Sequence, residues 1–261
     1  METGKRCWVQ TCWLVLCLLS TFYGTSAHSE DIRDVCSIQG SSSGDSKWCS
    51  SSARQGTDVD IYEALWVENL DLVEQILQLP FLQHMQRGNL PVDSYINFMM
   101  QDIYYLVTVT DMLEEMSRRV EEPPDLKEFL VERHQSYKRS STRMLQKFNL
   151  KGVSDIKVIP AMKSYLDEYQ RVMEEEEAIM MAASLMPCST LWVWLANQLH
   201  IDYDNAYWIW KKNNMYRNPE KHYKDLLNKH LKDDKKIKRA KEMFRKQMQS
   251  EHDFFKALVP N

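Results

Sequence analysis

The sequence predicts an all-α fold for the folded part of the chain, which is expected to begin near Asp58. Two observations lead to this prediction. From that point on only Gly88 and Gly152 remain of the seven glycines, and the apolar residues recur at spacings of three and four instead of alternating. Such a pattern is typical of helices joined by short turns. No strand-like alternation of any length and no internal repeat is found, so one helical domain is expected over residues 58–261.

The first 27 residues have the build of a secretory signal peptide. A basic pair is followed by a short apolar run and then by small residues, which are Lys5 and Arg6, Cys12 to Leu19, and Thr25 to Ala27. This order predicts that the mature chain is secreted. The apolar run is too short to span a bilayer, and no later stretch is expected to reach the required length of uncharged apolar residues, so no membrane span is expected.

The cysteines predict one disulfide bond and one free thiol in the mature chain. Removal of the signal peptide leaves Cys36, Cys49 and Cys188, an odd number for an oxidising compartment. Cys36 and Cys49 flank a Ser/Gly-rich segment and can close a short loop, so residues 28–57 are expected to form an extension pinned by a disulfide. Cys188 has no obvious partner and lies in an apolar helical pattern, where a lone cysteine is more often a small buried hydrophobe than a reactive group.

Charge and composition argue against several classes of ligand. Without residues 1–27 the chain keeps 31 of its 33 basic and 36 of its 37 acidic residues, a net charge near −5 that argues against nucleic acid as a partner. Two glycines cannot build a phosphate-binding loop, so no nucleotide cofactor is indicated. The seven histidines lack the spacing of metal ligands, so no metal, haem or other cofactor is expected.

One side of the first expected helix carries four apolar residues, Leu65, Leu72, Ile76 and Leu79. This helix is expected to end or bend near Pro80, and residues 88–91 are typical of a turn. A second helix is expected from Asp93, which is placed to cap it, to about Val109. Its inner face would carry large apolar residues and one acid: Tyr95, Phe98, Met99, Asp102, Tyr105 and Leu106.

Pro123 and Pro124 interrupt the helical pattern, and a third helix fits about Leu126 to Phe148. A fourth fits about Ile159 to Met173, and one of its sides carries Tyr165, Tyr169 and Val172. The four acids of residues 174–177 are expected to form a solvated turn or a helix start, because like charges that are adjacent in sequence repel one another and are seldom buried.

The stretch from Ala178 to Leu199 is strongly apolar and is interrupted by Pro187. A proline inside a helical pattern removes a hydrogen bond and bends the axis, so two helical pieces are expected to meet just before Cys188. A short aromatic helix is expected over residues 204–213, and a long charged one over residues 225–258. One face of this last helix places a carboxylate in an apolar stripe formed by Phe244, Met248, Glu251 and Phe255.

Several acids and phenols therefore lie on helix faces that are otherwise expected to be buried. They are Asp102, Tyr105, Tyr165 and Glu251, and Cys188 lies in a comparable apolar setting. Each of them alone is better explained as a hydrogen-bonded core residue, because buried polar groups are ordinary in large helical domains when they are paired. Their joint occurrence indicates a polar pocket inside a helical domain.

Four motifs in this order resemble those of the thiaminase II (TenA-type) family. The first joins residues 80–82 (Pro-Phe-Leu) to residues 88–91 (Gly-Asn-Leu-Pro), and the second is the run 98–106 (Phe-Met-Met-Gln-Asp-Ile-Tyr-Tyr-Leu). The third is Tyr165 at the family's distance before the sequence Met-Pro-Cys that ends in Cys188. The fourth is the run 251–255 (Glu-His-Asp-Phe-Phe). The resemblance covers roughly Ile61 to Leu258.

This resemblance implies a haem-oxygenase-like helical bundle, often a homotetramer, that cleaves thiamin between its aminopyrimidine methylene and its thiazolium. It implies that Cys188 is the nucleophile and that Glu251 moves protons at a ring nitrogen, a division of labour that suits a thiolate and a carboxyl of raised pKa. Asp102 would bind the exocyclic amine and help to position or ionise the thiol. The flat ring would lie against Tyr105, Tyr165 and Phe254.

Two positions depart from the family pattern. Trp192, a candidate substrate-binding residue, stands where the family usually has a tyrosine, and Asn214 stands in place of a second tyrosine. The first change removes a phenol that could orient water, so an amine or thiol co-substrate could resolve the adduct, as in base exchange of the thiaminase I type. Secretion favours the same acceptor. Salvage of thiamin fragments for biosynthesis is an intracellular task, whereas a secreted enzyme is expected to destroy the vitamin outside cells.

Three other functions stay open on the sequence alone. The first is hydrolysis of the amino group of a degraded aminopyrimidine, and the second is binding of a pyrimidine without turnover, with Trp192 filling space beside the thiol. Haem oxygenase activity, the third, is disfavoured, because the polar surroundings of His84 make it a poor axial ligand.

Overall fold

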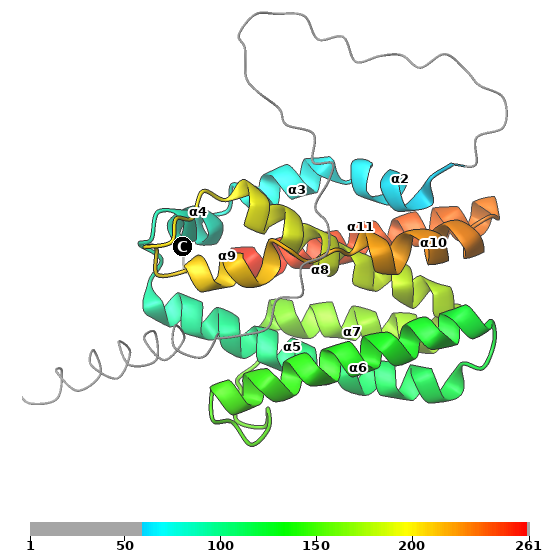
Figure 1. Cartoon of the computed structure of the whole chain (residues 1–261), viewed down its shortest axis with the longest axis horizontal. Coiled ribbons are helices and arrows are strands. Elements are labelled where there is room, and N and C mark those ends of the chain that lie inside the picture. Colours follow the sequence, from blue (N-terminus) through cyan, green and yellow to red (C-terminus); the bar gives the residue numbers. More distant parts are fainter. Residues whose placement is uncertain (1–58, 260–261) are drawn as a thin grey trace, which may run out of the picture. The chain divides into compact units, whose positions relative to one another are not determined.

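The computed structural model describes residues 59–259, which form helices without any strand, so the predicted all-α class is confirmed for this part of the chain (Figure 1). The helices are α2 (Ile61–Val67), α3 (Leu70–Leu77), α4 (Pro80–Gln86), α5 (Val92–Arg119), α6 (Pro124–Lys147), α7 (Pro160–Glu175), α8 (Ala178–Gln198), α9 (Trp208–Asn214), α10 (Glu220–His230) and α11 (Asp234–Ala257). The expected signal peptide, the extension over residues 28–57 and the Cys36–Cys49 disulfide lie outside the described residues.

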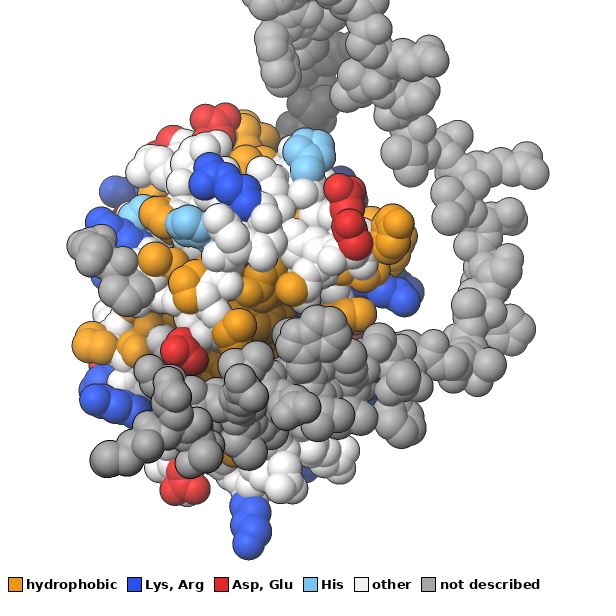
Figure 2. Space-filling model, turned by 90° about the vertical axis from the view of Figure 1, so that its left-hand side faces the viewer, with side chains coloured by type: hydrophobic (Ala, Val, Ile, Leu, Met, Phe, Trp, Pro, Cys, Tyr) orange, Lys and Arg blue, Asp and Glu red, His pale blue; other side chains and the backbone are white. Residues whose placement is uncertain are grey.

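The long helices α5, α7, α8 and α11 surround the centre of the bundle. α5 packs most extensively on α6, and α8 on α11, while α7 contacts α5, α8 and α11. In Figure 1, α5 and α6 cross the lower part of the bundle as a pair, and α2 and α3 lie along the opposite edge. A single apolar core connects these helices. On the face that carries α4 and the start of α5, Figure 2 shows hydrophobic side chains interspersed with polar and charged ones.

Side-chain contacts fix the direction in which α7, α8 and α11 run. Near the start of α8, Glu176 pairs with Arg239 of α11, and near its end the Trp192 indole donates to Glu251 of α11 at 3.2 Å. Both residue numbers rise together, so α8 and α11 are parallel. On α7, Tyr165 also contacts Glu251, whereas the later Arg171 reaches Met243. α7 is therefore antiparallel to α11.

The segment expected to form one helix before Pro80 is in fact broken. Asn69 separates α2 from α3, because its side-chain amide donates to the carbonyl of Leu65 at 2.8 Å and so satisfies a group at the end of α2. Pro80 begins α4, where the missing N–H of a proline costs nothing. The turn expected at residues 88–91 is present, and Gly88 adopts a φ of 72° that suits glycine.

Two further helix boundaries differ from the expected ones. α5 runs on to Arg119 instead of ending near Val109, because a further set of apolar residues continues its buried face: Met112, Leu113 and Met116. Asp93 lies in its first turn but makes no capping hydrogen bond. The last expected helix is two helices, α10 and α11, because Asp233 accepts hydrogen bonds from the backbone of Lys235 and Lys236 and starts α11 afresh.

α8 is one continuous helix, not two pieces meeting before Cys188. Pro187 lies inside it, and burial of the surrounding residues outweighs the loss of one backbone hydrogen bond. The expectation that no stretch after the N-terminus is long and apolar enough to cross a membrane was wrong, because α8 is. However, 67 % of this stretch is buried among the other helices, so the core accounts for its apolar character.

The acidic run 174–177 is only partly the solvated turn that its charges predicted. Glu174 and Glu175 are exposed, but only 14 % of the Glu176 side chain is accessible. The guanidinium groups of Arg239 and Arg171 hydrogen-bond to Glu176 and lower the pKa of its carboxyl to about 2. This pairing joins the end of α7 to α11 and makes burial of the charge tolerable.

Candidate active site

A narrow pocket with a cavity volume of about 10 Å³ lies between α5, α7, α8 and α11. Each helix contributes two residues three or four positions apart, a spacing that puts both on one helix face. The eight lining residues are Asp102 and Tyr105, Met162 and Tyr165, Cys188 and Trp192, and Glu251 and Phe254. The structure therefore brings together all seven residues that the sequence and the resemblance nominated as catalytic or substrate-binding, and it adds Met162.

Glu251 is the most enclosed acid of the pocket, with 1 % of its surface exposed. The Tyr165 hydroxyl donates to Oε1 at 2.7 Å, and the Trp192 indole N–H donates to Oε2 at 3.2 Å. Burial raises the pKa of this carboxyl, an effect that the hydrogen bonds from Tyr165, Trp192 and the Cys188 thiol partly offset. A carboxyl of raised pKa can accept and return a proton near neutral pH.

The Cys188 thiol faces Glu251 and Tyr105 across the pocket. Burial raises the pKa of the thiol well above its ordinary value, and the negative charges of Glu251 and Asp102 raise it further, whereas the Tyr105 hydroxyl lowers it. The thiol is therefore protonated at neutral pH in the protein alone. It needs a base before it can act as a nucleophile, and Glu251 accepts its hydrogen bond.

Asp102 is the second acid of the pocket. Burial raises the pKa of its carboxyl to about 7; the Arg217 charge opposes this rise, and the nearby Glu251 adds to it. Two carboxyls with raised pKa values thus lie close to one thiol. Such coupled, perturbed groups in a pocket are more typical of catalytic sites than of an ordinary core.

Asp102→Asn should stabilise the protein by an amount that grows from about pH 4 to about pH 7 and is constant above that range. Above pH 3.8 the unfolded chain loses this proton, whereas the folded chain keeps it up to about pH 7, so a destabilising contribution grows across that range and is complete above it. Because Asp102 is not fully shielded from solvent, we expect a gain of about 1 kcal/mol, or about 2–4 °C in Tm, at pH 8 and none near pH 4. Calorimetry at both pH values measures it, and an equal difference at both would contradict the raised pKa.

Aromatic rings line the pocket on two sides. Phe98 stacks on Trp192 and on Phe254, with ring centroids 5.5 Å and 5.9 Å apart. On the other side the rings of Tyr105 and Tyr165 lie 5.5 Å apart. A flat heteroaromatic ring is a suitable ligand for walls of this kind.

Two tyrosines behind the pocket were not nominated from the sequence. The Tyr169 hydroxyl contacts the Tyr105 hydroxyl at 3.0 Å and donates to the Ser184 carbonyl at 3.1 Å. Tyr137 of α6 also hydrogen-bonds to Tyr105. The position of Tyr169 one turn after Tyr165 was a usable signal, because such residues share a helix face, but nothing in the sequence marks Tyr137.

Asn214, the second position that departs from the family pattern, does not line the pocket. It is buried on α9, where its Nδ2 donates to the Trp210 carbonyl at 2.8 Å and its Oδ1 has no partner in the part of the chain that the structure describes. The replacement of the family's tyrosine by Asn214 therefore lies behind the pocket wall and does not change the surface of the pocket.

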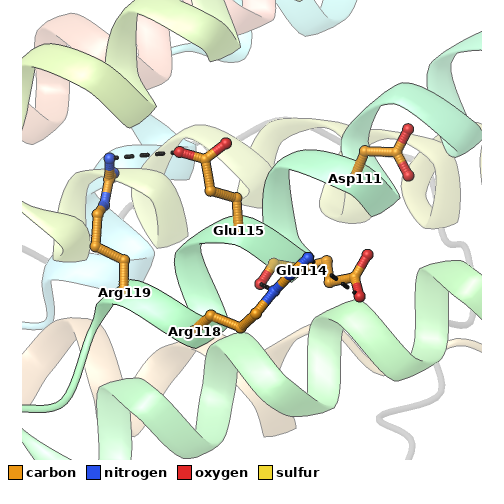
Figure 3. A pocket seen from close by; sticks show the side chains of 5 residues that line it. All are labelled: Asp111, Glu114, Glu115, Arg118 and Arg119. Atoms are coloured by element: carbon orange, nitrogen blue, oxygen red, sulfur yellow. Dashed lines mark hydrogen bonds and ion pairs between the residues drawn. The ribbon is translucent and has the colours of Figure 1, made fainter.

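A larger, open hollow lies on the outer side of α5 (Figure 3). Its lining consists of charged residues from that one helix: Asp111, Glu114, Glu115, Arg118 and Arg119. Arg118 pairs with Glu114 at 3.2 Å, and Arg119 pairs with Glu115 at 3.7 Å. Because four of the five charges are paired along a single exposed helix, the hollow is a solvated helix face.

Within residues 59–259 no group of three or more His, Cys, Asp or Glu side chains is arranged to hold a metal ion. The Nδ1 of His84, the histidine considered as an axial haem ligand, is hydrogen-bonded to Asn89 at 2.9 Å. The pocket itself offers one thiol, two carboxyls and two phenols.

Residues 68–260 match the model of the TENA/THI-4/PQQC family. No curated protein sequence matches the chain. A solved TenA homologue from Pyrococcus furiosus is 15% identical over 76% of this chain and 100% of that one, with a TM-score of 0.64. A TenA family transcription regulator from Silicibacter sp. TM1040 is 13% identical over 78% and 98%, with a TM-score of 0.66.

Heme oxygenase-1 from the cyanobacterium Synechocystis sp. PCC6803, solved in complex with heme, is 13% identical over 77% of this chain and 92% of that one, with a TM-score of 0.55. At such identities the likeness concerns the fold alone. The expected haem-oxygenase-like helical bundle is confirmed.

Proposed function

The chain belongs to the TENA/THI-4/PQQC family, and from this premise we propose that it breaks the bond between the methylene group of an aminopyrimidine and a nitrogen leaving group. Thiamin, whose leaving group is the thiazolium, is the first substrate we propose, which makes the chain a thiaminase. The observation that carries the proposal is one pocket holding a thiol, two carboxyls of raised pKa and stacked aromatic walls.

The proposed reaction begins at the contact between Cys188 and Glu251. Glu251 takes the thiol proton, the thiolate forms a bond to an electron-poor carbon of the pyrimidine, and Glu251 gives the proton to a ring nitrogen. Ring electrons then expel the thiazole, which leaves as a neutral molecule with the electron pair of the broken carbon–nitrogen bond. A nucleophile adds to the methylene, and the bond to Cys188 breaks. With water, the products are hydroxymethyl-pyrimidine, thiazole and one proton.

The other lining residues would hold the ring in place. The Asp102 carboxylate is a suitable acceptor for the exocyclic amine. Because the pKa of this carboxyl is about 7, a hydrogen bond from the amine would favour its ionised form at neutral pH. Tyr105, Tyr165 and Phe254 would flank the ring faces. Tyr165 also keeps Glu251 oriented through its 2.7 Å hydrogen bond.

The size of the pocket favours a second candidate, an aminopyrimidine aminohydrolase. The cavity volume of about 10 Å³ is far below the roughly 300–1,000 Å³ of pockets that enclose drug-sized ligands, so the pocket has to open for any substrate, and it has to open less for a single substituted ring than for the whole of thiamin. In this reaction ammonia leaves in place of thiazole, and the same thiol and carboxyl act. Thiamin would therefore need a larger opening of the pocket than aminomethyl-pyrimidine.

The test is to incubate the purified protein with thiamin or with aminomethyl-pyrimidine, with and without pyridine, and to identify the products by mass spectrometry. Thiazole released in water alone would support a thiaminase of the hydrolytic type, and a pyrimidine–pyridine adduct would support base exchange. Ammonia and hydroxymethyl-pyrimidine from the second substrate would support the aminohydrolase. Binding of both compounds without any product would overturn the enzymatic proposal.

Trp192→Tyr should shift the choice of acceptor toward water. The Trp192 indole donates to Glu251 and stacks on Phe98, so it occupies space beside the thiol where a phenol could hold water. With pyridine present, we expect the ratio of hydrolysis to exchange product to rise several-fold. Trp194→Phe, at a half-buried position on the same helix that packs on Trp66 away from the pocket, is the control and should leave the ratio unchanged. An unchanged ratio in the tyrosine variant would refute this role.

A further inference from the structure

Three polar atoms that have no hydrogen-bond partner among residues 59–259 lie one helical turn before Cys188 and Glu251. They are the Oγ of Ser184 and both amide atoms of Gln247. Both side chains are fully buried, at 0% exposed. Buried polar atoms left unpaired are costly, and where no protein group satisfies them their usual partner is an ordered water with about three hydrogen bonds.

The parallel register of α8 and α11 brings Ser184 and Gln247 face to face. Glu176, which lies just before α8, pairs with Arg239 of α11, 63 positions later in sequence. Ser184 and Gln247 have the same separation, and so do Cys188 and Glu251, which hydrogen-bond to each other. Moving one turn back from that contact on both parallel helices leads to Ser184 and Gln247.

Tyr169 of α7 completes this buried group. Because α7 is antiparallel to α11, one turn forward from the Tyr165–Glu251 contact on α7 corresponds to one turn back on α11, which places Tyr169 opposite Gln247. The Tyr169 hydroxyl also donates directly to the backbone carbonyl of Ser184 at 3.1 Å. Tyr169, Ser184 and Gln247 therefore form a polar layer directly behind the pocket.

The hydrogen bonds of this layer control where the Tyr105 proton can go. A tyrosine hydroxyl has one proton, and that of Tyr169 is used on the Ser184 carbonyl. The Tyr105 hydroxyl lies 3.0 Å from the Tyr169 hydroxyl and also interacts with the Cys188 sulfur, and its one proton can serve only one of these two partners at a time. Tyr105 keeps its proton on the sulfur more fully when another donor serves the Tyr169 oxygen.

We propose that Ser184 and Gln247 hold internal water that donates to the Tyr169 oxygen and thereby frees the Tyr105 hydroxyl to hydrogen-bond to the Cys188 thiolate. The Ser184 hydroxyl and the Gln247 amide offer both donors and acceptors, so they can fix a water with one proton directed at Tyr169. Both are positioning residues, since neither lines the pocket. The inference rests on the proposed function in one respect only, which is the use of the Cys188 thiolate as a nucleophile.

The ionisable groups that face Cys188 come from five helices. They are Asp102 and Tyr105 of α5, Tyr137 of α6, Tyr165 and Tyr169 of α7, Tyr223 of α10, and Glu251 of α11. A substitution at Gln247 changes none of these groups. A shift in the titration of the thiol on such a substitution therefore reports on the polar layer.

The experiment is to alkylate the full chain with iodoacetamide over a pH series and to quantify the modified Cys188 peptide by mass spectrometry. In Gln247→Leu we expect the midpoint for Cys188 to rise by about one pH unit, which is about tenfold slower alkylation at a fixed pH below the midpoint. Met248→Leu, at the next position and equally buried but without a polar atom, should leave the midpoint unchanged.

An unchanged midpoint in a folded Gln247→Leu variant would overturn the proposal, and so would an equal shift in Met248→Leu. If Gln247→Leu does not fold, Ser184→Ala removes only one hydroxyl and should shift the midpoint in the same direction. No substrate is present, so failure of this inference is distinguishable from failure of the proposed function. A protein without thiaminase or aminohydrolase activity could still show the shift.

Discussion

Cys188→Ala should abolish turnover of thiamin and of aminomethyl-pyrimidine while leaving the helices intact. Without the sulfur no bond to the pyrimidine carbon can form, so we expect kcat to fall by at least about three orders of magnitude. The remaining seven lining residues stay in place, and removal of one small side chain should cost only about 1–2 kcal/mol of stability. Product formation measured by mass spectrometry, together with far-UV circular dichroism, tests both parts.

Thr190→Val is the matched control for this variant. Thr190 lies on the same helix two positions after Cys188, outside the pocket lining, and its hydroxyl donates back to the Met186 carbonyl at 2.8 Å. We expect activity close to that of the unaltered protein, since valine keeps the shape of the side chain. Activity in Cys188→Ala within tenfold of the control would rule out the covalent mechanism in favour of direct attack by water.

The helices could be predicted from the sequence where the apolar period alone determines them. α6 and α7 begin and end within about two residues of the expected positions, because their apolar residues continue to the ends and prolines begin both helices. The breaks at Asn69 and Asp233 could not be predicted, since each depends on one side chain that satisfies specific backbone groups. The sequence also offered no measure of how far burial of α8 would outweigh Pro187.

The candidate site could be anticipated because it uses two residues on each of four helices at helical spacing. An acid on an apolar face, such as Glu251, is visible in the sequence as an exception to the pattern. The register between helices is not visible, because it depends on tertiary contacts such as the pairing of Glu176 with Arg239. For this reason the contacts of Trp192 with Glu251 and the layer around Gln247 emerged only from the structure.

Glu251→Gln should lower turnover and at the same time make Cys188 more reactive toward alkylation. Glutamine cannot take the thiol proton or return it to the ring, so we expect kcat/KM to fall by about 10²–10⁴. It also removes the negative charge that raises the pKa of the Cys188 thiol, so at neutral pH more thiolate is present and iodoacetamide should react faster. Few substitutions move these two quantities in opposite directions.

A fall in turnover together with a rise in the alkylation rate distinguishes a catalytic carboxyl from a structural one. If Glu251 only held Tyr165 and Trp192 in place, its loss would loosen the pocket and lower turnover without a specific gain in thiolate. Glu242→Gln, at an exposed position on the same helix that pairs with Arg239, should change neither quantity. Slower alkylation together with slower turnover in Glu251→Gln would contradict the roles assigned to both residues, because the carboxylate opposes ionisation of the thiol until it accepts the proton.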